Sequence, residues 1–195
     1  MAICGLISSG SAYDCDSPIT PGLNPRVWLA NHNDIESITF DVSNKRLVTA
    51  IVFKTGGALY PYEGTRQSAN ASSEFVPQTL SSGFKHILDL RVFSIDSAQK
   101  LELEKMCLGK IVGVVEHPNT VGNGDAVFEL FGAGVGLEVE TLTRISRDTE
   151  GQGSYALILG TSDNEGQEAT LPLSVLATDY ATTLALLEGY ETPAA

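Results

Sequence analysis

Residues 94–116, SIDSAQKLELEKMCLGKIVGVVE, decide the fold because a capped helix here runs directly into a buried strand. Asp96 followed by Gln99 three residues later is the pattern of a helix N-cap. Gly109 is placed where a helix can end in a left-handed C-cap. The apolar, β-branched run 111–115 has the length of a strand. Together with an apolar segment before it, the stretch predicts a strand–helix–strand unit at the centre of the chain.

The predicted helix is apolar on two opposite sides. At about 100° per residue, one stripe contains Ala98, Leu101 and Leu108, and the other contains Leu103, Met106 and Cys107. One stripe can pack on the domain's own sheet, so the other needs a second partner. That partner is either another part of this chain or a neighbouring subunit. Periodicity alone does not choose the outward stripe, and we expect it to be Leu103, Met106 and Cys107.

Strand-like segments flank this unit on both sides. They are residues 26–31, 35–42, 47–54, 58–64, 84–93, 126–131, 135–145 and 154–160. Alternating apolar and polar residues in several of them predict sheets with one solvent-exposed face. A second helix is expected at 178–188, with Gly189 ending it. The predicted fold class is therefore mainly β (α+β), with a central flanking helix and a C-terminal helix.

Two segments without regular patterning are candidates for contacts with a partner. Residues 1–25 are rich in proline and glycine and predict an extended arm ahead of a single β-rich domain, residues 26–195. Residues 64–83 predict a long loop or hairpin that protrudes from this domain. The apolar residues expected to make these contacts are Ile3, Leu6 and Ile7 on the arm, and Phe75 and Val76 in the loop.

Composition argues against several functions. The 195 residues carry 24 acidic and 12 basic side chains, a net charge of −12, and no Lys or Arg follows Arg147. Such a surface repels phosphates, which disfavours a protein that grips nucleic acid. No apolar run reaches the roughly 18 residues of a membrane helix, and the start lacks the basic segment of a signal peptide. Cys4, Cys15 and Cys107 do not have metal-ligand spacing, and their odd number indicates free thiols in a reducing compartment.

No arrangement of residues predicts an active site. His32, His86 and His117 are isolated from one another and lack metal-binding spacing. The glycine-rich run 132–136 leads into a strand, whereas a phosphate-binding loop precedes a helix, so it predicts a bulge or tight bend. Glu138 and Glu140 share one face of a strand, where solvated carboxylates are common. We therefore expect a protein that is not an enzyme and has no cofactor, metal or small-molecule substrate.

The order of elements and two segments resemble the tube-forming structural proteins of tailed bacteriophages and related injection systems. The segments are residues 90–116, LRVFSIDSAQKLELEKMCLGKIVGVVE, and 128–161, FELFGAGVGLEVETLTRISRDTEGQGSYALILGT. The resemblance implies a β-sandwich or open β-barrel flanked by a helix, assembled into stacked hexameric rings. Such a protein is made in the bacterial host cytoplasm and acts in the virion, as the phage tail tube.

In this role the partners are further copies of the chain and other virion proteins. The resemblance implies that DNA passes through the tube as cargo that does not adhere, with Glu138 and Glu140 as acidic residues facing the lumen. The acidic C-terminal quarter leaves open an auxiliary, head–tail connector or capsid-decorating role in the same particle. A third hypothesis is a β-sandwich ligand-binding module with Trp28, Tyr60 and Tyr62 as its platform.

Overall fold

Strand β7 (Ile111–Glu116) is buried along its whole length at the centre of the protein. We describe a computed structural model covering residues 7, 9–11, 19–77, 82–118, 124–149, 151–162 and 166–194. In it, β7 pairs with β1 (Arg26–Asn31) on one side and with β8 (Phe128–Phe131) on the other. Both faces of β7 are covered, and this is why its sequence is a continuous apolar run.

Two sheets surround this strand. Sheet A has the order β2-β3-β11-β8-β7-β1-β4, and sheet B has the order β5-β6-β10-β9. The remaining strands of sheet A are β2 (Ile35–Phe40), β3 (Leu47–Phe53), β4 (Tyr60–Glu63) and β11 (Leu173–Val175). Sheet B consists of β5 (Ala69–Val76), β6 (Gly83–Val92), β9 (Glu138–Arg144) and β10 (Tyr155–Gly160). A 3-10 turn, η1 (His32–Asp34), joins β1 to β2.

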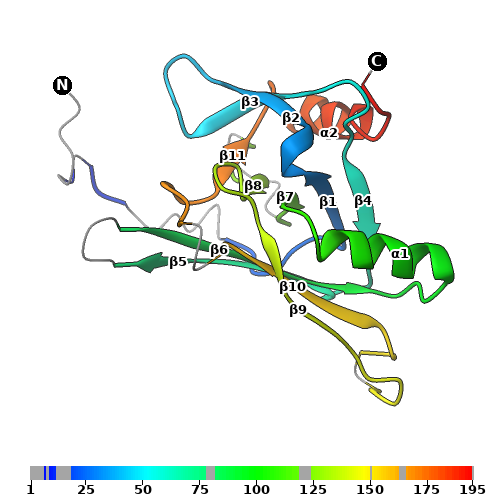
Figure 1. Ribbon diagram of the computed structural model, residues 1–195. Helices are drawn as coiled ribbons and strands as arrows, with labels where there is room; N and C mark the ends of the chain where they lie inside the picture. The colour runs from blue at the N-terminus through cyan, green and yellow to red at the C-terminus, as the bar shows by residue number, and fades with distance from the viewer. Residues whose placement is uncertain are drawn as a thin grey trace.

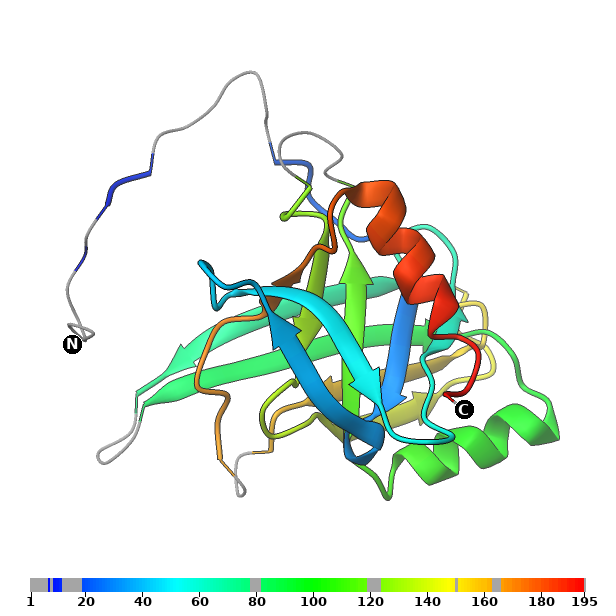
Figure 2. The same cartoon turned by 90° about the horizontal axis from the view of Figure 1, so that it is seen from above.

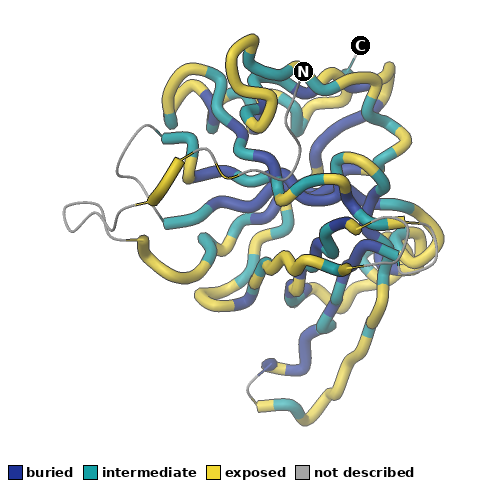
Figure 3. Tube along the Cα trace, turned by 90° about the vertical axis from the view of Figure 1, so that its left-hand side faces the viewer, coloured by how far each residue is buried: buried dark blue, intermediate teal, exposed yellow. Residues whose placement is uncertain are grey.

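The elements stack in three layers. Sheet B packs on one face of sheet A, and α2 (Tyr180–Gly189) packs on the other face (Figures 1 and 2). The strands of the two sheets cross at a steep angle (Figure 2). Because side chains alternate along β1, Trp28 points into the cluster under α2 and Leu29 into the cluster under sheet B. Buried residues gather where the layers meet, and exposed ones lie along the outer hairpins (Figure 3).

Helix α1 (Ser97–Met106) begins as its sequence predicts. The Asp96 side chain caps it by accepting a hydrogen bond of 2.7 Å from the Gln99 N–H. The C-terminal prediction was wrong, because the helix ends at Met106 and Gly109 does not have a left-handed backbone. Instead, the Gly109 N–H donates to the Met106 carbonyl, which closes a short turn ahead of β7.

Helix α2 is attached to sheet A at both ends. Asp179 caps its N-terminus through the Thr182 N–H at 2.8 Å. The Tyr180 hydroxyl donates to the buried Glu116 carboxylate at 2.9 Å. Beyond the other end, the Tyr190 hydroxyl accepts from the Ile51 N–H at 3.1 Å, and Trp28 Nε1 donates to Glu191 at 2.9 Å. The expected C-terminal helix is therefore present and forms one layer of the fold.

The structure confirms a mainly β fold with two sheets and two helices among the described residues. The segment 64–83 differs from a plain loop, because residues 69–76 form strand β5, which pairs along its whole length with β6. The hairpin alternative describes it. The Ser- and Ala-rich sequence of β5 lacks the apolar alternation by which a strand is recognised, because β5 lies at a sheet edge where little apolar burial is needed. Strand β11 was not predicted, because its three residues are held by partners distant in sequence.

Candidate functional site

The most extended unpaired surface is formed by the two edges of sheet B. Strand β5 has eight residues and β9 has seven, and neither contains a proline. At the other sheet, edge strand β4 carries Pro61, which lacks an N–H and so blocks pairing with a further strand. Its second edge strand, β2, has six residues, and its pairing with β3 shifts register twice. Sheet B therefore keeps two edges that can accept another strand.

The direction of the free backbone groups of β5 follows from its register with β6. The Arg91 N–H donates to the Ser68 carbonyl at 2.9 Å, which directs the backbone of Ser68 toward β6. In an antiparallel pair this direction alternates along the strand. The residues whose N–H and C=O groups point to the free edge are therefore Ala69, Ala71, Ser73 and Phe75. Four donors and acceptors in a row are available to a neighbouring strand.

The face of sheet B that points away from sheet A carries mostly small and polar side chains, together with two isoleucines. Strand alternation places on it Asn70, Ser72, Glu74, Lys85, Ile87, Asp89, Arg91, Thr141, Thr143, Ala156 and Ile158. Both cations of this face are paired: Lys85 Nζ lies 2.7 Å from Glu140 Oε1, and Arg91 Nη1 lies 3.4 Å from Asp148 Oδ2. The described part of the face thus offers a phosphate no unpaired positive charge.

Glu138 and Glu140 do not form a pair of free carboxylates. Glu138 Oε1 lies 3.8 Å from Lys110 Nζ, whereas Glu140 binds Lys85 on β6. Strand β9 has a β-bulge at Glu140. Val139 pairs with Leu159 and Thr141 with Ile158, so Glu140 has no partner residue on β10. A bulge shifts the alternation of side chains, which is why simple period-2 counting does not describe this strand.

The predicted outward stripe of α1 was wrong for Leu103 and Met106. Leu103 is only 2% exposed and belongs to the core cluster between the sheets, against which Met106 also packs. Cys107 is exposed, as is the opposite stripe, where Leu101 is 52% and Leu108 91% exposed. Both stripes are equally apolar in sequence, and only the position of the helix over Leu29 and Ile111 decides between them. Leu101 on α1 and Leu108 in the turn after it are thus the apolar residues that a partner can reach.

The other interface candidates lie in different environments. Phe75 is 58% exposed near the end of β5 and touches the ring of Phe84, with 5.6 Å between ring centroids. Val76 is half-buried at the same strand end, and Ile7 is almost fully exposed. Ile3 and Leu6 lie outside the described residues. The structure therefore places Phe75 and Val76 together at the free edge of sheet B.

The backbone N–H groups of the glycine-rich turn 132–136 bind a carboxylate of the same chain, that of Glu168. The Glu168 carboxylate is buried and accepts hydrogen bonds from the N–H groups of Gly134, at 3.0 and 3.1 Å, and Val135, at 2.9 Å. Gly132 and Gly136 both have positive φ, which L-residues rarely adopt. The sequence indicated the bend but not Glu168, because no local pattern links the two segments.

His86 is a core residue beside this loop. Its Nδ1 accepts from the Gly132 N–H at 3.2 Å, so the neutral ring carries its proton on Nε2, which donates to the Thr170 carbonyl at 2.9 Å. Burial lowers the pKa of His86, and the nearby Glu168 carboxylate opposes that effect. Both ring nitrogens are used, so His86 holds three segments together and is not placed to transfer protons.

The described residues contain no cluster of His, Cys, Asp and Glu side chains that could hold a metal ion. Neither described helix has the length and apolarity that crossing a membrane requires.

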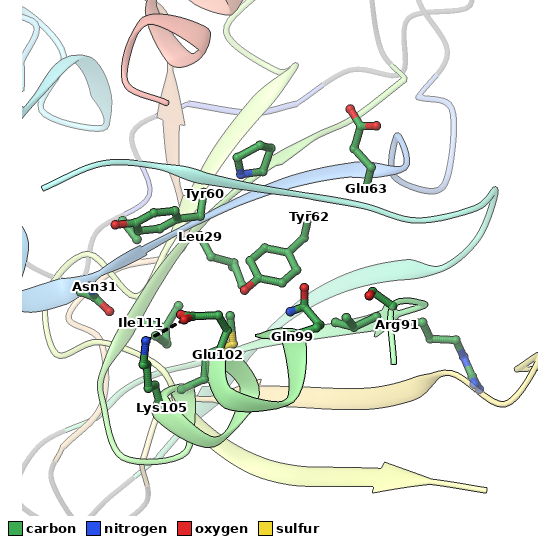
Figure 4. Close-up of a pocket in the computed structure, with 15 residues that line it drawn as sticks. Leu29, Asn31, Tyr60, Tyr62, Glu63, Arg91, Gln99, Glu102, Lys105 and Ile111 are labelled. Atoms are coloured by element: carbon green, nitrogen blue, oxygen red, sulfur yellow. Dashed lines mark hydrogen bonds and ion pairs between the residues drawn. The ribbon is translucent and has the colours of Figure 1, made fainter. Parts of the chain in front are cut away.

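The predicted ligand platform of Trp28, Tyr60 and Tyr62 was wrong for Trp28. Trp28 is fully buried under α2, since its ring packs edge-on against Phe128. Tyr60 and Tyr62 instead line a groove between β4 and α1, with a volume of 670 Å³ (Figure 4). The two tyrosines are therefore accessible without the tryptophan that was expected beside them.

Comparison of the chain with models of known protein families, with curated proteins and with solved structures finds no match.

Proposed function

We propose that the protein is a structural subunit that assembles into rings by joining the edges of sheet B, and that these rings stack into a phage-type tail tube. The observation that carries the proposal is a four-stranded sheet with long, proline-free strands at both edges. Unpaired edges of this length are an aggregation hazard unless a specific partner covers them. A second copy of the same chain is a partner of matching length.

The strand directions suit a repeating assembly. Along sheet B every neighbouring pair is antiparallel, so β5 and β9 run in opposite directions. When copies are related by rotation about a common axis, β9 of one copy meets β5 of the next in antiparallel orientation. This contact joins two different surfaces, and such contacts close into rings when the rotation permits. The result is a continuous β-barrel without free edges.

The outer face of sheet B suits the inside of such a ring. Both helices lie on the side of sheet B that faces sheet A, which leaves the other face open (Figure 1). Its cations are already paired with carboxylates, and the chain as a whole carries a charge of −12. DNA affinity depends on unpaired Lys and Arg near the phosphates. A lumen lined by this face lets DNA pass without adhering, as the tail-tube role requires, and the protein then acts in the virion without chemistry of its own.

The proposal is tested by replacing Ser73 with proline. Ser73 is exposed and its N–H points to the free edge, so Ser73→Pro removes an edge donor without removing a β5–β6 hydrogen bond. We expect wild-type protein to form rings or tubes by negative-stain microscopy and light scattering, and Ser73→Pro to remain a folded monomer. The matched control is Ser73→Ala, which keeps the N–H and should assemble like the wild type.

Three outcomes decide between the readings. A wild-type protein that stays monomeric at high concentration contradicts the proposal, as does a Ser73→Pro variant that assembles normally. Discrete rings that never stack would favour the connector role over the tube. Circular dichroism of Ser73→Pro shows whether the variant has kept the wild-type fold, so loss of assembly is not confused with unfolding.

A further inference from the structure

The groove between α1 and β4 is built from two walls that come from different parts of the chain. Tyr60, Pro61 and Tyr62 of β4 form one wall, and Gln99, Glu102 and Lys105 of α1 form the other (Figure 4). Its floor is apolar and consists of Leu29, Met106 and Ile111. A volume of 670 Å³ is within the range of small-molecule sites, which is about 300–1,000 Å³.

The β4 wall presents two aromatic rings in sequence. Tyr60 and Tyr62 are two residues apart on a strand, so both side chains point to the same face, roughly 7 Å apart. Figure 4 shows the two rings one after the other along β4, with Tyr62 directed toward Gln99 of α1 and Tyr60 directed toward the side of Asn31. Tyr60 is 47% exposed, whereas burial raises the pKa of the half-buried Tyr62. Flat rings at this spacing can stack on two successive rings of an extended ligand.

The groove offers no unmatched charge. Glu102 Oε1 and Lys105 Nζ lie 2.6 Å apart and neutralise each other within the groove. The Glu63 carboxylate binds Arg26 at 2.6 Å, and the Arg91 guanidinium leads away from the groove toward Asp148 (Figure 4). An anionic or cationic ligand would have to break one of these ion pairs. A neutral ligand would not.

The remaining polar groups at the groove are amides and hydroxyls. Asn31, Ser94 and Gln99 line it together with the tyrosines. The Gln99 side-chain amide lies against the Tyr62 hydroxyl, and their interaction opposes the rise in the Tyr62 pKa that burial causes. The Asn31 amide donates to Asp34 at 2.8 Å and the Ser94 hydroxyl to Asp96 at 2.6 Å, so the oxygen atoms of both side chains can accept hydrogen bonds from ligand hydroxyls. These groups suit a ligand with many hydroxyls.

An extended peptide fits this groove less well. A peptide that binds beside an edge strand does so by adding its own strand to the sheet. The outer edge of β4 carries Pro61, which has no N–H to donate and interrupts the ladder at its centre. The aromatic wall and the polar groups remain available to a ligand that needs no strand pairing.

We infer that the groove between α1 and β4 is a binding site for a neutral oligosaccharide, stacked on Tyr60 and Tyr62 and hydrogen-bonded by the amides and hydroxyls opposite. The lining residues do not belong to β5 or β9, so the site is separate from the edges proposed for assembly.

The test is an NMR titration of the ¹⁵N-labelled full chain carrying Ser73→Pro against neutral trisaccharides: maltotriose, cellotriose and triacetylchitotriose. The substitution is chosen because an assembled wild type would be too large to give resolved amide signals. We expect at least one of them to shift the amide signals of β4 and α1 with a dissociation constant of about 1 mM or lower. Tyr60→Ala should weaken that binding about tenfold, and Tyr60→Phe should retain it, because the stacking ring remains. Phe75→Ala removes an exposed aromatic residue elsewhere and should change nothing.

Several results would overturn the inference. One is the absence of shifts with all three trisaccharides. Another is binding that Tyr60→Ala leaves unchanged, and a third is binding of a proline-rich peptide in place of the sugars. Isothermal titration calorimetry, which does not depend on particle size, should give the same affinity for the wild type as for Ser73→Pro. Failure of the assembly proposal and failure of this inference are therefore distinguishable.

Discussion

Leu101 and Leu103 are two residues apart on α1 and lie in opposite environments. Leu103 fills the core between the sheets, and half of Leu101 is in water. We expect Leu103→Ala to lower the free energy of unfolding by about 2–5 kcal/mol, since it leaves a cavity. Leu101→Ala is the matched control and should change it by at most about 0.5 kcal/mol. Urea unfolding followed by circular dichroism measures both, and equal costs would contradict the orientation of α1 described here.

Glu168 illustrates what a sequence does not reveal at this scale. Its carboxylate is held by N–H groups of a turn more than thirty residues earlier in the chain. The glycines of that turn were recognisable because positive φ restricts the choice of residue. The partner was not, since any of the 24 acidic residues could have supplied the anion.

At the scale of elements, the attachment of helix α2 to sheet A depends on Tyr190, the residue just after the helix. The Tyr190 hydroxyl accepts from the Ile51 N–H, and the Tyr190 ring packs against Phe53 with 5.4 Å between centroids. Tyr190→Phe keeps the ring but leaves the N–H unpaired, which should cost about 1–3 kcal/mol of unfolding free energy.

Urea unfolding measures the cost, and hydrogen exchange at Ile51 should become faster in the variant. Tyr60→Phe, at a half-exposed tyrosine, is the control and should cost at most about 0.5 kcal/mol. An unchanged exchange rate at Ile51 would argue against this hydrogen bond as the attachment of α2.

Elements with strong local signals were predictable, and those held by distant partners were not. Asp96 and Asp179 cap their helices through their own first turns, and the run 111–115 is apolar because it is buried on both faces. By contrast, β5 has few apolar residues, and β11 has only three residues. For the same reason, the sequence identified two apolar stripes on α1 and could not say which one the core would take.

At the scale of the whole molecule, two histidines give stability opposite dependences on pH. A hydrogen bond from His117 to Glu129, 2.9 Å long, raises the pKa of His117, whereas burial lowers that of His86. The contribution of His117 is present below its unfolded pKa of about 6.5 and is lost as pH rises through its folded pKa. His86 is neutral in the fold, so it lowers stability as pH falls below about 6.5.

The two effects can be separated with Glu129→Gln. We expect this variant to lose most stability relative to the wild type between about pH 5 and pH 6.5, and less above about pH 8, where His117 is neutral in both states. Urea unfolding at a series of pH values gives the comparison. A loss that grows toward alkaline pH would have the wrong sign and would reject the assignment. Glu74→Gln, on the exposed edge strand β5, serves as the control.

Strand β11 has a consequence for the order in which the protein can be made. It is the only described strand that joins the hairpin β2–β3 to the rest of sheet A by strand pairing, and it comes long after β3 in the sequence. A ribosome therefore releases the first hairpin long before its neighbour in the sheet exists. Sheet B is likewise incomplete until β10 has been synthesised between β6 and β9. Contacts between residues so distant in sequence form slowly. The β3 side of the first hairpin is thus an uncovered strand edge while the intervening residues are synthesised, and such edges promote aggregation of nascent chains.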